Sequence, residues 1–444
     1  MRSYGACLAA LMLVAAPPGL AQEAARGTAA PASAGQLFQA GQFEQAGARY
    51  ARIVTGDPGD YTAVLNLGRV ALLANRLDDA ETWFGKAIAL RPHAAEPKVM
   101  RAAAYYRSYE FEKAAAALEG VDLAHDRLVI AQYPTLDVAQ LRSFRGQTPY
   151  EVQGAGQSIN VKLLRTDPLP LVSVRVNGGA PVTFFIDTGG SEIVLDTAFA
   201  RELGVPQFGA VTGTFSGGQH AEVKQGRIDA LAIGGWTVRN LPVAMMPLRQ
   251  LSKGLEATRI DGIVGTTFLY HFLATLDYPA GTLILRRKAP ASPRQVGAAP
   301  DHDGKTTVAV PFWIAGDHFM VGWGQVETLP PTLLFVDTGL TGAGVKLAES
   351  VIHRAGITLE EDKAEAGAGG AGNLRIVPYT VRRLSFGEAS EQNVPGLYDG
   401  PFPWETLFGF HLAGMVGHDF FKRYAVTFDF QNMRIILTRP RRGG

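Results

Sequence analysis

The sequence predicts a multidomain protein in which N-terminal all-α helical repeats precede an all-β region built from two similar lobes. A period of about 34 residues in the N-terminal part predicts the repeats. Short β-rich runs separated by Gly and Pro predict the β region. The tripeptide Asp-Thr-Gly, at 187–189 and again at 337–339, marks its two halves.

Length and charge set the first limits on organisation and partners. The 444 residues are enough for about three domains of ~150 residues each. The 42 basic and 41 acidic residues give a net charge of +1, and the sequence has no basic stripe of the kind a nucleic-acid surface requires. We therefore expect a globular protein with no nucleic-acid partner.

Residues 1–21 have the pattern of a secretory signal peptide. Arg2 supplies a positive charge, Leu8–Ala16 form an apolar run, and Gly19–Ala21 offer a cleavage site. Because the run is too short to span a bilayer, we expect an exported protein, periplasmic or secreted (bacterial), with no membrane span after signal cleavage. An uncleaved anchor is the alternative. The only cysteine, Cys7, lies in this segment, so the mature chain would have no disulfide.

Three segments match one another at the repeat period. They are Gly41–Ala46, Asn75–Ala80 and Tyr109–Ala114. In the middle unit, the small residues Gly68 and Ala80 would let two helices approach closely, and Phe84 would fill the gap between helix pairs.

This pattern resembles the tetratricopeptide repeat over about residues 33–121. Three repeats are about the minimum for a stable stack, and such a stack usually offers a concave face to a partner segment. We therefore expect a possible protein partner on the helical repeats, or a docking role toward the rest of the chain. A plain bundle of helical hairpins is the alternative.

The remainder of the chain divides at composition changes. Residues 122–157 are predicted to be a linker, with a propeptide-like cover as the alternative. Two lobes, 158–290 and 301–440, follow on either side of a Pro-rich break. They align well beyond the tripeptide, since Asp261–Gly265 corresponds to Ala413–Gly417. The chain thus contains an internal duplication of a β domain.

Each Asp-Thr-Gly follows an apolar run, which places its acid at the end of a predicted buried strand. The runs are Phe184–Ile186 and Leu334–Val336. A buried acid is costly unless it has a partner or a role. Asp187 and Asp337, in matching contexts, therefore predict a carboxylate pair of the kind that acts on water as a general acid/base dyad.

The order of motifs in each half is strand, Asp-Thr-Gly, glycine-rich hairpin, two apolar residues then Gly, short helix and final hairpin. This order resembles the aspartic peptidases, pepsin-like and retropepsin-like, over about residues 158–440. The resemblance implies an all-β bilobal aspartic peptidase fold with Asp187 and Asp337 as the catalytic pair. Two such carboxylates would share one proton, and no metal or cofactor would be required.

The resemblance also assigns roles to the residues that follow the two acids. Thr188 and Thr338 would hydrogen-bond across a pseudo-twofold axis and lock the loops together. Gly189 and Gly339 would let the backbone turn tightly there.

Two glycine-rich segments match the position of the flap that closes over a peptide in this family. They are Thr212–Gly218 and Gly367–Gly372. We expect substrate contacts from Phe215, Ser216, Gly217, Gly218, Gly369 and Gly370. Because the second segment has almost no side chains to grip a substrate, ordinary loops are the alternative for one or both.

The chain departs from the pepsin-like pattern directly after each tripeptide. Gly190 and Leu340 stand where a Ser or Thr hydroxyl would donate to the outer carboxylate oxygen. Losing that donor disfavours the ionised form. We therefore expect a raised dyad pKa and an activity optimum nearer neutral pH than that of pepsin.

Together these features predict an exported aspartic-type endopeptidase, a hydrolase acting on a peptide or protein substrate. Its helical repeats would recruit a partner or the substrate. A catalytically silent peptide-binding or assembly protein on the same fold is the alternative. The nine histidines show no metal-ligand spacing, and no metal site is predicted.

Overall fold

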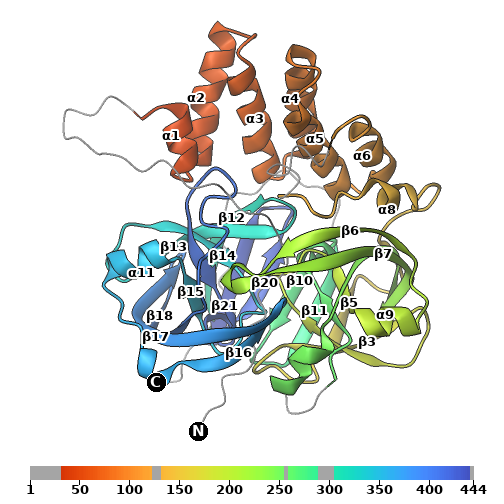
Figure 1. Cartoon of the computed structure of the whole chain (residues 1–444), viewed down its shortest axis with the longest axis vertical. Coiled ribbons are helices and arrows are strands. Elements are labelled where there is room, and N and C mark those ends of the chain that lie inside the picture. The colour runs from red at the N-terminus through yellow and green to blue at the C-terminus, as the bar shows by residue number, and fades with distance from the viewer. Residues whose placement is uncertain (1–31, 123–131, 255–258, 289–304, 441–444) are drawn as a thin grey trace.

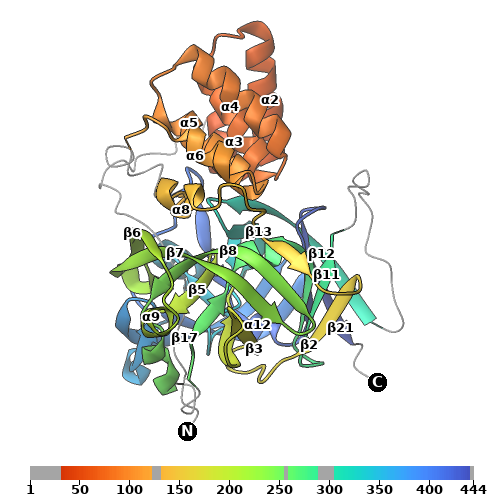
Figure 2. The same cartoon turned by 90° about the vertical axis from the view of Figure 1, so that its right-hand side faces the viewer.

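The computed structural model describes residues 32–122, 132–254, 259–288 and 305–440 (Figure 1). The predicted signal peptide, residues 1–21, lies outside the described residues. The described chain is a stack of helices over a large β region (Figures 1 and 2), which confirms the predicted fold class. None of the described helices has the length and apolar character needed to cross a membrane.

The helical stack contains six helices in the described residues. They are α1 (Ala34–Gln39), α2 (Phe43–Gly56), α3 (Tyr61–Leu73), α4 (Leu77–Leu90), α5 (Ala95–Arg107) and α6 (Phe111–Ala117). The turn inside each pair is equivalent, because Gly41, Asn75 and Tyr109 all have positive φ, at 75°, 55° and 62°. A methyl group on Gly68 would lie 2.5 Å from the Phe84 ring, so that glycine lets α3 and α4 approach.

The segment predicted as a linker, residues 122–157, is in its described part built into the first lobe, and the linker prediction was wrong there. It contains α8 (Val138–Arg142) and β1 (Glu151–Gln153), and β1 pairs with β8 (Trp236–Met246). Its apolar side chains, such as Phe144 and Tyr150, are buried. The Gln140 amide donates to two carbonyls of the first lobe.

The first lobe contains an eight-stranded sheet of order β1-β8-β5-β9-β4-β3-β7-β6. Its other strands are β3 (Leu171–Val176), β4 (Val182–Ile186), β5 (Ile193–Asp196), β6 (Gln207–Thr214), β7 (His220–Ile233) and β9 (Gly262–Val264). Helices α9 (Thr197–Glu202) and α10 (Thr266–Tyr270) follow β5 and β9. The parallel pair β4–β9 lies at the centre and leads directly to Asp187.

The second lobe repeats this arrangement. Its strands are β13 (Phe319–Val326), β14 (Thr332–Val336), β15 (Val345–Leu347), β16 (Glu365–Gly369), β17 (Gly372–Phe386), β18 (Ala389–Tyr398) and β19 (Leu412–Val416). Helices α11 (Glu349–Ala355) and α12 (His418–Phe421) follow β15 and β19. The parallel pair β14–β19 is the counterpart of β4–β9 and leads to Asp337.

A six-stranded segment of sheet joins the two lobes, in the order β12-β21-β20-β10-β11-β2. Its strands are β2 (Ser158–Lys162), β10 (Phe272–Asp277), β11 (Thr282–Arg287), β12 (Lys305–Ala315), β20 (Ala425–Asp429) and β21 (Arg434–Pro440). At its centre Thr275 of β10 pairs with Thr427 of β20, and their hydroxyls are 2.7 Å apart. The lobes are therefore halves of one continuous body.

The helical stack packs on this body through a shared apolar core. The Phe43 ring lies 5.2 Å from the Trp313 ring and 5.0 Å from the Phe410 ring, both edge to face. Buried Arg107, at the end of α5, donates to the backbone oxygens of Ile314 and Gly316. The repeats are thus attached to the lobes by packing and by buried hydrogen bonds.

Candidate active site

The two predicted acids lie at equivalent strand ends, where the lobes meet. Asp187 follows β4 and Asp337 follows β14. Each backbone N–H continues the parallel ladder, donating to Val264 O at 3.0 Å and to Val416 O at 2.9 Å respectively. Both side chains have no solvent exposure, so the fold holds two carboxyl groups in its interior.

Each glycine of the tripeptides faces the carboxyl group of the opposite lobe. A methyl group on Gly189 would lie 2.7 Å from Asp337 Cγ, and one on Gly339 would lie 2.4 Å from Asp187 Cγ. Each glycine N–H also donates to Oδ1 of its own aspartate at 2.8 Å. Neither glycine has a positive φ. Each glycine does lie in a tight turn, since Gly190 N–H donates to Asp187 O at 3.2 Å and Leu340 N–H donates to Asp337 O at 3.4 Å. What requires glycine there is the close approach of the opposite carboxyl group, which leaves no room for a side chain.

The two threonines hydrogen-bond across the axis in a symmetric arrangement. Thr188 N–H donates to Thr338 Oγ1 at 3.0 Å, and Thr338 N–H donates to Thr188 Oγ1 at 3.0 Å. The Thr188 hydroxyl donates to Val336 O at 2.8 Å, and the Thr338 hydroxyl donates to Ile186 O at 3.1 Å. These four hydrogen bonds thus hold the two Asp-Thr-Gly loops at a fixed distance from each other.

Short helices begin directly behind both loops. At the start of α10, Thr266 N–H donates to Gly190 O at 2.8 Å, and at the start of α12, His418 N–H donates to Leu340 O at 3.0 Å. The Leu340 side chain packs against Gly417, where a methyl group would lie 2.6 Å from Leu340 Cδ2. The leucine after the second tripeptide therefore fits the loop, and its own N–H donates to Asp337 Oδ1 at 3.1 Å.

The electrostatic environment favours protonation of the pair. Burial, and next the charge of Asp337, raise the pKa of Asp187 well above its ordinary value. Burial also raises the pKa of Asp337, to about 6. The outer oxygens, Oδ2 of both residues, are buried without a hydrogen-bond partner among the described residues. In the described part of the chain, no hydroxyl donates to these outer oxygens in place of the one that Gly190 and Leu340 lack. Two carboxyls buried in this way would share a proton.

Both glycine-rich segments are β-hairpin tips, and the tips meet. The first lies between β6 and β7 and the second between β16 and β17. A methyl group on Gly370 would lie 2.3 Å from the Phe215 ring, and Gln219 Nε2 donates to Asn373 O at 2.9 Å. The missing side chains of the second hairpin are thus what lets the first hairpin pack against it.

The predicted flap residues separate into buried and turn-forming positions. Phe215 and Ser216 have no solvent exposure. Gly217 and Gly218 both have φ of 70°, a conformation that favours glycine. Gly369 ends β16 and is buried, and Gly370 follows it in the turn. The hairpin tips therefore bridge the two lobes, and the Phe215 ring is part of a buried apolar cluster.

A hydrogen bond that sequence analysis did not predict links the aspartate loop of lobe 1 to the helical repeats. Glu192, five positions after Asp187, is buried and accepts a hydrogen bond from the Tyr106 hydroxyl of α5. Burial raises the pKa of Glu192 to about 8. No sequence signal could have identified this pair, because the partner comes from another domain.

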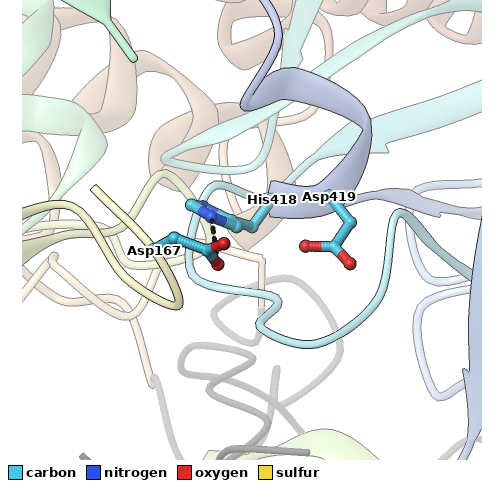
Figure 3. A group of neighbouring side chains, drawn as sticks. All are labelled: Asp167, His418 and Asp419. Atoms are coloured by element: carbon cyan, nitrogen blue, oxygen red, sulfur yellow. Dashed lines mark ion pairs between the residues drawn. The ribbon is translucent and has the colours of Figure 1, made fainter. Parts of the chain in front are cut away.

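A second group of titratable side chains, Asp167, His418 and Asp419, offers ligand atoms within 4.8 Å of one another. The buried His418 ring points toward Asp167 (Figure 3), with Nε2 3.3 Å from Oδ1. Lys422 Nζ lies 2.8 Å from Asp419 Oδ1 and 3.4 Å from Asp167 Oδ2. His418, and next Lys422, lower the pKa of Asp167 to about 2. The Lys422 ammonium thus bridges the two carboxylates, and these side chains form an ion-pair cluster.

Comparison with known proteins supports the two-part organisation. Residues 172–268 match the family described as aspartyl protease, and residues 37–85 match the tetratricopeptide repeat family. The predicted combination of these two architectures is therefore confirmed. A solved structure titled "Crystal structure of MamA" is 22% identical, with a TM-score of 0.22, over 26% of this chain and 66% of that chain. No curated protein matches the chain.

Proposed function

We propose that this chain is an aspartic endopeptidase in which Asp187 and Asp337 act as one dyad. The observation that carries the proposal is the mutual burial of two carboxyl groups, each facing the tripeptide glycine of the other lobe. Such an arrangement is costly, and the fold stabilises it with four cross-lobe hydrogen bonds. Raised, coupled pKa values are typical of groups that move protons.

The dyad would act on a water molecule and a peptide carbonyl. The ionised carboxylate takes a proton from the water as the water oxygen attacks the carbonyl carbon, and the protonated partner donates to the carbonyl oxygen. The tetrahedral intermediate then collapses, the C–N bond breaks, and the amine leaves with a proton from the dyad. Because the two groups titrate as a pair, neither is assigned alone as the acid.

Access to the dyad requires the hairpins to open. Both carboxyls are fully buried, and the tips of the β6–β7 and β16–β17 hairpins contact each other. We propose that the hairpins lift to admit a peptide and then cover it from this raised position, which would exclude bulk water during the reaction.

Export and recruitment complete the proposed function. The N-terminal signal pattern supports a periplasmic or secreted protein, and a tetratricopeptide stack is a common protein-binding module. Fractionation of a tagged full-length chain, with N-terminal sequencing of the mature product, tests export. Retention of the precursor in the cytoplasm would contradict it.

Cleavage of a peptide library by purified protein tests the chemistry. Asp187→Asn and Asp337→Asn should each lower kcat/KM by more than ~1,000-fold, because either change removes one proton carrier. Asp229→Asn is the matched control, since that side chain is 70% exposed. If the wild-type protein cleaves no peptide, or either dyad variant cleaves as well as wild type, the catalytic assignment fails.

A further inference from the structure

An equivalent buried position of the two lobes holds an apolar residue in lobe 1 and a charged residue in lobe 2. In lobe 1 a row of three strand-paired residues crosses β5, β9 and β4: Val194, Ile263 and Phe185. In lobe 2 the same row crosses β15, β19 and β14: Lys346, Met415 and Phe335. Each row ends two residues before the aspartate of its lobe. A lysine therefore stands where the pseudo-twofold axis would place a valine.

Lys346 is fully buried between the lobes. Its Nζ lies 2.5 Å from Asp399 Oδ1 and donates to the Ser216 hydroxyl at 2.9 Å. Ser216 belongs to the tip of the β6–β7 hairpin of lobe 1, so the hairpin supplies one acceptor to a cation of lobe 2. The Asp399 side chain is also buried, and its Oδ2 has no hydrogen-bond partner in the described part of the chain.

The residue before Ser216 contacts a different surface. Phe215 is buried in a lobe 1 cluster that includes the apolar row of Val194, Ile263 and Phe185. The hairpin tip thus places two consecutive side chains in two environments. The aromatic ring occupies an apolar surface of lobe 1, and the hydroxyl occupies a hydrogen-bonding position on the ion pair of lobe 2.

We propose that Lys346 and Asp399 form a specificity-determining subsite for a small uncharged side chain that carries a hydroxyl or amide. The apolar surface of lobe 1 formed by Val194, Ile263 and Phe185 would bind a large apolar side chain of the substrate on the other side of the cleaved bond. This inference rests on the proposed function. When the hairpin lifts, Lys346 loses the Ser216 acceptor; a substrate hydroxyl or amide restores it and can donate to Asp399 Oδ2.

The charges around the subsite disfavour the other side-chain classes. A substrate carboxylate would bring another negative charge to Asp399 and the dyad, and a substrate ammonium would face Lys346 at low dielectric. An apolar side chain would leave the Lys346 donor unsatisfied, which costs about 1–3 kcal/mol or more. Since 1.4 kcal/mol is about tenfold, we expect at least ~10-fold discrimination.

Peptides test the preference directly. Each contains Phe on one side of the bond and Ser, Asn, Leu, Asp or Lys on the other, in both orders. The Ser and Asn peptides should have kcat/KM at least ~10-fold above the other three. In the double variant Lys346→Val/Asp399→Asn, which removes both charges together, Leu should become the preferred residue. The control, Lys113→Val/Glu110→Gln, changes an exposed pair on the repeats and should keep the wild-type ranking.

A binding measurement separates this inference from the proposed function. Fluorescence anisotropy with labelled peptides and the full-length Asp187→Asn variant ranks the same side chains without cleavage. If the wild type cleaves nothing but binding favours Ser and Asn, the proposed function fails and the subsite stands. If Leu, Asp or Lys rank first, or the double variant keeps the wild-type ranking, the subsite is overturned.

A milder variant keeps the inference testable if the double variant does not fold. Ser216→Ala removes the hydroxyl that occupies the subsite in the closed hairpin and leaves Lys346 and Asp399 in place. It should lower KM for the Ser and Asn peptides and leave the Leu peptide unchanged. An equal change in KM for all peptides would mean that Ser216 only stabilises the hairpin, and would overturn the subsite.

Discussion

At the scale of single residues, the site depends on groups held in costly states. Asp187 and Asp337 are buried, their pKa values are raised, and their outer oxygens lack partners among the described residues. Lys346 and Glu192 are also buried. Natural proteins retain such groups at the expense of stability when function needs them.

Asp187→Asn should make the folded protein more stable. The folded state keeps a proton on the dyad that the unfolded state releases near pH 4, so ionising the pair opposes folding increasingly as pH rises. A neutral amide removes that cost. The melting temperature at pH 8 should rise by a few degrees, at roughly 1 °C per kcal/mol for a cooperative unit of this size, and the difference should shrink at pH 5. Scanning calorimetry measures this, with Asp229→Asn as the unchanged control.

Activity should fall at acidic pH with a midpoint near the pKa of Asp337. Burial raises that pKa to about 6, and below it both carboxyls carry protons, so no base remains to activate water. The expected profile of kcat/KM therefore has its acidic limb near pH 6 and high activity near neutral pH. An optimum below about pH 3 would contradict the raised dyad pKa.

At the scale of elements, the site is assembled from two loops and two hairpins, and each lobe contributes one loop and one hairpin. The threonine hydroxyls bond the strand end of the opposite lobe. The two hairpin tips contact each other through Phe215 and Gly370. Because every one of these contacts crosses between halves, the site exists only when both lobes are folded together.

Thr188→Val tests the cross-lobe bonds. It removes the donor to Val336 O and the acceptor for Thr338 N–H, and each buried group left unpaired costs about 1–3 kcal/mol. Chemical denaturation should show a loss of about 2–5 kcal/mol together with reduced kcat. Thr188→Ser keeps the hydroxyl and should retain most of the wild-type stability and kcat. Equal losses in the two variants would mean that the methyl group of Thr188, and not its hydroxyl, is what matters.

At the scale of the whole molecule, the helical repeats and the β lobes form one body. Arg107 of α5 donates to backbone oxygens at the end of β12, and Tyr106, the residue before it, donates to Glu192 in the lobe 1 loop. One helix end of the repeats therefore contacts both lobes. A repeat domain that served only to dock a partner would not need these buried contacts with the lobes.

Deleting residues 33–121 should abolish cleavage of short peptides as well as partner capture. The deletion would expose Trp313 and Phe410 and leave the carbonyls bonded by Arg107 unpaired. Full activity of the deleted chain on short peptides would contradict this expectation.

The variant Arg107→Met tests the same contact with a single substitution. It should lower the free energy of unfolding by more than ~2 kcal/mol. The control Arg76→Met, at an exposed ion pair, should lower it by less than ~0.5 kcal/mol.

Much of the architecture could be predicted from sequence because it follows from local repetition. The repeat period predicted the helical stack, and the duplicated tripeptide predicted two equivalent acids. The linker prediction failed because buried residues such as Phe144 and Tyr150 show no periodicity over so short a segment. The sequence placed Gly189 and Gly339 in tight turns, but it could not show that each glycine faces the carboxyl group of the other lobe.

The sequence by itself determined the two-part plan, the duplication and the placement of Asp187 and Asp337 at strand ends, because periodicity and local propensity suffice for these. Only the tertiary structure decided that a shared sheet fuses the lobes, that the hairpin tips close on each other, and that Lys346 faces Ser216. These features depend on contacts between residues more than a hundred positions apart, and no local pattern encodes such a contact.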